Sequence, residues 1–67
     1  MEVSAKDFRN FLDKCVKENK MTEQQMYELE YTCAELSLRP DQSALQKFIS
    51  KVENDIYDNG KLTMEIR

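Results

Sequence analysis

The chain has 67 residues and a formal net charge of −3; 40% of its residues are hydrophobic, 34% are charged, and none is His or Trp. A chain this short buries only about 60% of its unfolded surface, so we expect one small domain over residues 1–67 or one half of a dimer. The lack of His removes the usual general base of a nucleophilic triad and the commonest zinc ligand, so we expect no catalysis, no metal site and no cofactor.

The first predicted helix covers residues 5–19. Ser4 followed by Asp7 resembles a capping box, in which the first side chain accepts a hydrogen bond from the backbone three residues later. Apolar residues then recur at the i, i+3, i+4, i+7 spacing that puts one stripe on one face of a helix. The stripe contains Phe8, Phe11, Leu12, Cys15 and Val16. We expect it to face the core.

The second predicted helix covers residues 23–38 and begins with a fuller capping signal, Thr22 with Gln25 three residues later. Helical spacing divides its apolar residues into two stripes on adjoining sides. The first stripe contains Met26, Leu29, Cys33 and Leu36, and the second contains Tyr27, Tyr31, Ala34 and Leu38. A helix with two apolar stripes must pack against two surfaces, which are either both neighbouring helices of a bundle or one neighbouring helix and a partner.

The third predicted helix covers residues 41–58. It begins after Arg39-Pro40, because proline disfavours helix at the residue before it. It ends before Asn59-Gly60, where glycine supplies the left-handed residue that closes many helices. Its apolar stripe contains Leu45, Phe48, Ile49, Val52 and Ile56.

The C-terminal residues change period. Leu62, Met64 and Ile66 alternate with polar residues over 61–66, which is the spacing of a β-strand. A lone strand needs a mate, and the candidates are residues 1–3, a second copy of the chain, another protein, or a hairpin across Asn59-Gly60. The predicted fold is therefore mainly all-α, a three-helix bundle with a short C-terminal β-strand or hairpin.

Charge and aromatic residues together indicate a site on the second helix. Segment 21–38 carries four glutamates and has no Lys or Arg. Tyrosine is enriched at interfaces because it joins an apolar ring to a polar tip, and flanking carboxylates favour a basic partner. The predicted partner-binding residues are Tyr27, Glu28, Tyr31, Glu35 and Leu38. The competing interpretation is that the two tyrosines only cover the bundle.

A second interpretation concerns residues 34–45, which have the pattern of a helix, a short turn and another helix. With a wing-like strand at 61–67, this pattern resembles a winged helix-turn-helix, and the resemblance implies DNA binding by residues facing base edges. Those residues are Gln42, Ser43, Gln46 and Lys47. Pro40 in the turn and the acidic helix before it count against DNA binding, because that helix would cross phosphates.

We therefore predict a small acidic cytosolic protein-binding module, which acts without catalysis as a stoichiometric regulator or accessory factor of a larger partner. The partner would be another protein with a basic surface, and a homodimer is also expected because a small core leaves apolar surface uncovered. A DNA-binding regulator is the alternative, and imitation of nucleic acid by the acidic helix is a third hypothesis. No signal peptide and no membrane span is visible, which favours a cytoplasmic location. The composition fits a bacterial or phage accessory protein.

Overall fold

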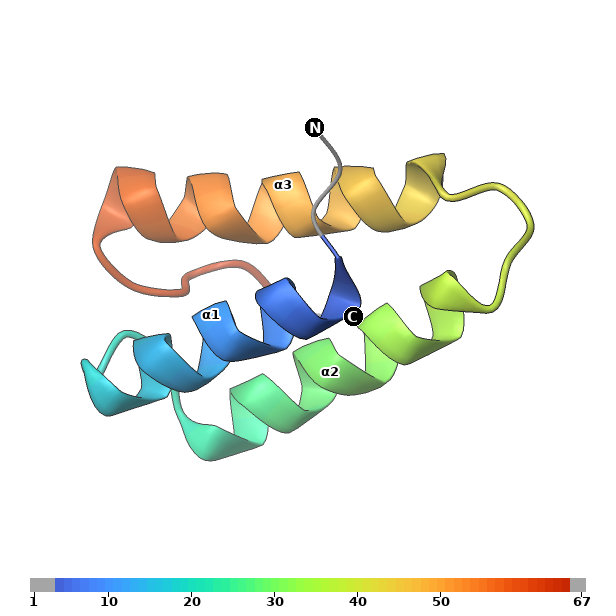
Figure 1. Ribbon diagram of the computed structural model, residues 1–67. Coiled ribbons are helices and arrows are strands. Elements are labelled where there is room, and N and C mark those ends of the chain that lie inside the picture. Colours follow the sequence, from blue (N-terminus) through green and yellow to red (C-terminus); the bar gives the residue numbers. More distant parts are fainter. Residues whose placement is uncertain (1–3, 66–67) are drawn as a thin grey trace.

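The computed structural model describes residues 4–65, which form three α-helices joined by short loops (Figure 1). Helix α1 spans Ala5–Lys17, α2 spans Glu23–Ser37 and α3 spans Ser43–Asn59. Helix α2 contacts both of the others, and the rings of Phe8 in α1 and Phe48 in α3 meet edge to face with centroids 6.0 Å apart. The three helices therefore form the predicted bundle.

The start of α2 confirms the predicted cap. The Oγ1 atom of Thr22 accepts a hydrogen bond from the backbone N–H of Gln25 at 3.1 Å, and the side chain of Gln25 accepts one from the N–H of Thr22 at 2.9 Å. At α1 the Ser4 hydroxyl accepts from the N–H of Asp7 at 3.1 Å. Each bond satisfies a backbone donor that has no partner inside its helix.

Two helix ends differ from the predicted bounds by two residues, and the ends of α2 and α3 differ by one residue. Helix α1 ends at Lys17 because Asn19 adopts a left-handed conformation with φ of 61°, and the N–H of Lys20 then donates to the carbonyl of Cys15 at 2.8 Å. Helix α3 begins at Ser43 rather than at residue 41, since the carboxylate of Asp41 accepts from the N–H of Ser43 at 2.9 Å and forms a turn ahead of the helix.

The core lies between the three helices and is closed at one end by the segment after α3. In the predicted apolar stripe of α3, every residue except Phe48 is buried. In the first stripe of α2, Leu29 and Cys33 are buried. The buried residues are Phe8, Leu12, Cys15, Met21, Leu29, Cys33, Leu45, Ile49, Val52, Ile56 and Leu62. Phe48, Met26 and Leu36 are half-buried and pack against this cluster.

The predicted C-terminal strand is wrong for the residues that the structure describes. Residues 61–65 form no strand; after Gly60, whose φ is 75°, they turn back toward the loop between α1 and α2 (Figure 1). Leu62 is buried, and its N–H donates to the carbonyl of Lys20 at 2.7 Å. Met64 is half-buried on the core. The backbone thus finds partners inside the domain, and Ile66 lies outside the described residues.

Candidate functional site

The second apolar stripe of α2 faces solvent. Tyr27 is 55% exposed, Tyr31 is 66% exposed and Leu38, just after the last helical residue, is 86% exposed. Ala34 between them is also exposed. We call these four residues the α2 seam. The bundle uses the other side of α2 for its core, so the seam is surface that folding leaves uncovered.

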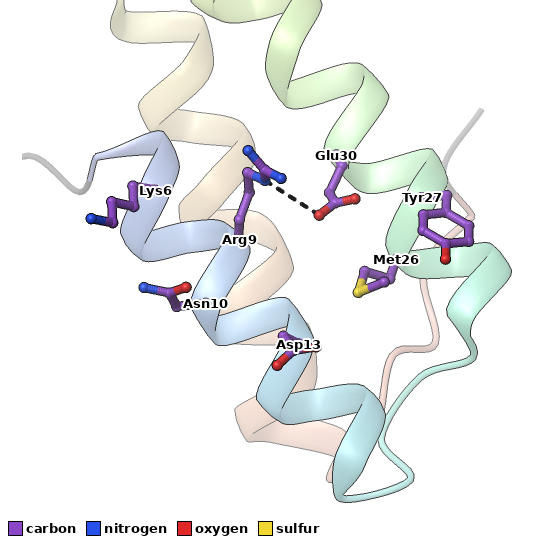
Figure 2. A pocket seen from close by; sticks show the side chains of 7 residues that line it. All are labelled: Lys6, Arg9, Asn10, Asp13, Met26, Tyr27 and Glu30. Carbon is purple, nitrogen blue, oxygen red and sulfur yellow. Dashed lines mark hydrogen bonds and ion pairs between the residues drawn. The ribbon is translucent and has the colours of Figure 1, made fainter.

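A groove between α1 and α2 runs beside the seam (Figure 2). Arg9 of α1 and Glu30 of α2 point toward each other across it, with Arg9 Nε 3.4 Å from Glu30 Oε1. A shallow pocket of about 500 Å³ contains this pair, and it is lined by Lys6, Arg9, Asn10, Asp13, Met26, Tyr27 and Glu30. Tyr27 therefore contributes to the groove as well as to the seam.

A second pocket of about 530 Å³ continues the groove toward the C-terminal end of α2. It shares Arg9, Tyr27 and Glu30 with the first pocket and adds Tyr31 and Ala34. The small Ala34 side chain leaves a recess beside the ring of Tyr31. Aromatic walls around a recess are the surroundings in which an anchoring side chain of a partner is well desolvated.

Glu28 and Glu35 lie on the flank of the seam opposite the Arg9–Glu30 pair. Glu28 is half-buried and its carboxylate accepts a hydrogen bond from the Gln24 side chain at 3.2 Å, while Glu35 is exposed. Within residues 4–65 neither carboxylate forms an ion pair. The seam therefore has one flank with uncompensated negative charge and one flank where charge is neutralised.

The structure thus leaves four of the five predicted partner-binding residues exposed along one side of α2 and its C-terminal end, with Glu28 half-buried beside them. Sequence reasoning missed the contribution of α1, because spacing along one helix does not show which of its side chains reach a neighbouring helix. Asp13, four residues after Arg9, pairs with Lys17 at 3.1 Å. Only the packing of α1 against α2 shows that Arg9 reaches Glu30.

The residues of the DNA-binding interpretation lie around the start of α3. The Gln42 side chain donates to the carbonyl of Arg39 at 2.6 Å, and the N–H of Ser43 donates to Asp41, so these two residues hold the loop between α2 and α3. Gln46 is half-buried and Lys47 is exposed. Residues 61–65 supply no wing strand, so the described chain lacks one of the two parts on which the resemblance depends.

The two cysteines belong to the core, as predicted. Both thiols are free and buried, and burial raises the pKa of Cys15 and of Cys33, with nearby Lys20 and Arg9 acting in the opposite direction. Because the thiolate is the reactive form, these thiols are poor nucleophiles at neutral pH. Residues 4–65 contain no group of three or more Cys, Asp or Glu side chains arranged to hold a metal ion.

No protein-family model, curated protein or solved structure matches this chain. The function is therefore inferred from the surface of the bundle alone. Among the described helices none is both long enough and apolar enough to span a membrane.

Proposed function

We propose that this protein binds another protein through the α2 seam and acts as a stoichiometric regulator or accessory factor. The observation that carries the proposal is the alignment of Tyr27, Tyr31 and Leu38 on a helical face that the bundle does not cover. Single exposed apolar residues are ordinary on protein surfaces, whereas an aligned strip of large ones is typical of an interaction site.

The types of residue in the groove also support protein binding. Tyrosine and arginine are enriched among the residues that dominate binding energy at interfaces. Here Tyr27, Tyr31 and Arg9 line the same groove. A partner seated on the seam would contact both rings and the guanidinium together.

The proposal is tested by affinity capture from an extract of the native host, read by mass spectrometry. The immobilised baits are the wild type, a Tyr31→Ala, Leu38→Ala double variant, and Tyr57→Ala as the control, since Tyr57 is 73% exposed on α3, where its ring contacts Phe11 of α1 and no residue of the seam is part of that contact. We expect one protein to be retained in stoichiometric amount by the wild type and by Tyr57→Ala but not by the double variant. Equal retention by all three baits, or by none, would contradict the proposal.

DNA binding is the second candidate function, favoured by Lys47 and Lys51, which lie one turn apart on the exposed side of α3. The wild type and Lys47→Ala are compared in a gel shift at about 50 mM salt, where phosphate contacts are strongest. Retardation by the wild type that is lost in Lys47→Ala would support DNA binding. No retardation at this salt concentration would remove it.

A further inference from the structure

Building on the proposed function, we propose that the partner seated on the α2 seam is an amphipathic helix of another protein, with Lys or Arg flanking its apolar stripe, and not a second copy of this chain.

The spacing of the seam favours a helix as the partner. Tyr27, Tyr31, Ala34 and Leu38 are separated by four, three and four residues, which is the alternation of apolar positions along a helix that packs against another helix. Tyr27 and Leu38 are eleven positions apart, so at a rise of about 1.5 Å per residue the seam is about 16 Å long, or three helical turns. The recess at Ala34, between the larger Tyr31 and Leu38, would accept one projecting side chain of the partner.

The flanks of the seam determine which charges the partner helix carries. Glu28 and Glu35 directly follow Tyr27 and Ala34, so they lie on one flank, seven residues and about 10 Å apart. Neither has a cation within the described chain, whereas Glu30 on the other flank is neutralised by Arg9. A partner with Lys or Arg at seven-residue spacing would meet both uncompensated carboxylates.

The same charges disfavour a second copy of this chain. In an antiparallel pair of α2 helices, the flank that carries Glu28 and Glu35 would face its own copy. In a parallel pair, Glu35 of one chain would approach Glu30 of the other, whose charge Arg9 already balances, so Glu35 would gain no cation. Segment 21–38 has no Lys or Arg, so a second copy offers Glu28 and Glu35 no cation in either arrangement, and the like charges of the antiparallel pair oppose pairing.

The test is a displayed library of helical peptides of about 21 residues, three heptads long. Leu or Ala fills the apolar positions, and Lys or Glu is encoded with equal frequency at the flanking positions. The full-length wild-type chain is the bait, and peptides that also bind Tyr31→Ala are removed. We expect Lys to exceed Glu severalfold at the flanking positions of the enriched peptides.

Two matched charge reversals then locate the contact for the most enriched peptide. Glu35 and Asp58 are exposed carboxylates in the last turns of α2 and α3, so Glu35→Lys and Asp58→Lys change the net charge equally. By fluorescence anisotropy we expect Glu35→Lys to weaken binding about three- to tenfold and Asp58→Lys to leave it within about twofold. Equal effects of the two reversals would show that only net charge matters and would overturn the inference.

The remaining outcomes separate this inference from the proposed function. Enriched peptides that require Tyr31 but show no preference for Lys would leave protein binding standing and overturn the basic helix. A library without any peptide that distinguishes the wild type from Tyr31→Ala would overturn the helical partner. A wild-type dimer in sedimentation equilibrium that is lost in Tyr31→Ala would assign the seam to a second copy instead.

Discussion

The carboxylate of Asp55 accepts a hydrogen bond of 2.6 Å from the backbone N–H of Thr63, and this bond ties the segment after α3 back onto that helix. The same carboxylate accepts from the Thr63 hydroxyl, from the N–H of Met64 at 3.1 Å, and from the side-chain amide of Asn59 at 2.9 Å. These bonds, which we call the clamp, hold Leu62 in the core without a strand mate.

Replacing Asp55→Asn should release this segment. The substitution removes the charge and exchanges one acceptor oxygen for an amide donor, so the N–H groups of Thr63 and Met64 lose a charged partner. We expect amide hydrogen exchange at these two residues to become about tenfold faster or more, measured by NMR. Asp58→Asn, which removes a neighbouring exposed carboxylate, is the control; unchanged exchange in Asp55→Asn would show that the clamp contributes nothing.

The clamp should open in acid. The hydrogen bonds from the hydroxyl and the N–H of Thr63 hold the pKa of Asp55 below its ordinary value of 3.8. A carboxyl with a lowered pKa in the folded state contributes stability that is fully present above its unfolded value and is lost as the pH falls through the folded value. In an NMR titration the Thr63 amide should therefore keep its position from pH 7 to about 5 and shift with a midpoint below 3.8. A midpoint above 3.8 would contradict the clamp.

Substitutions of Leu29, within α2, and of Leu38, just after it, should separate effects on folding from effects on binding. Leu29 is fully buried and Leu38 is 86% exposed. We expect Leu29→Ala to lower the free energy of unfolding by about 2–5 kcal/mol, enough to unfold much of so small a domain, and Leu38→Ala to change it by less than about 0.5 kcal/mol. Urea unfolding followed by circular dichroism measures both. A large loss in Leu38→Ala would mean that the seam serves the fold.

The capping box of α2 should have a measurable effect on stability. Thr22→Ala removes the acceptor for the N–H of Gln25, which costs about 1 kcal/mol at a helix start. In a domain of this size that loss lowers Tm by about 4–8 °C. Thermal melts of Thr22→Ala and of Thr22→Ser, which keeps the hydroxyl, check the cause: the serine variant should stay close to the wild type, and an equal loss in both would point to the methyl group instead.

The three helices and their core faces could be predicted because the signals are local. Capping residues act over three positions, and the 3.6-residue period reports the buried side of a helix directly. The largest error, the C-terminal strand, falls where a distant backbone or side-chain bond decides. Alternation of Leu62 and Met64 is shared by a strand and by an extended segment that packs on a core. Only the bonds that the Asp55 carboxylate and the Lys20 carbonyl accept distinguish the two.

The candidate site was predictable in part. Helical spacing alone placed Tyr27, Tyr31 and Leu38 on one side of α2, but in a three-helix bundle that side could equally have faced a neighbour. The relative placement of α1, α2 and α3 decides whether this side faces a neighbour or solvent. That placement depends on contacts between residues far apart in the sequence. For the same reason the bridge from Arg9 to Glu30, 21 positions apart, could not be anticipated.

The most direct measurement is the dissociation constant between this chain and the purified partner, determined by calorimetry for the wild type, Tyr31→Ala and Tyr57→Ala. Both variants remove one largely exposed tyrosine ring, so they change the composition of the chain equally. Loss of a central aromatic residue at an interface costs about 2 kcal/mol or more, so Tyr31→Ala should weaken binding at least about thirtyfold, and Tyr57→Ala should stay within about threefold. Equal affinities for the two variants would contradict binding through the α2 seam.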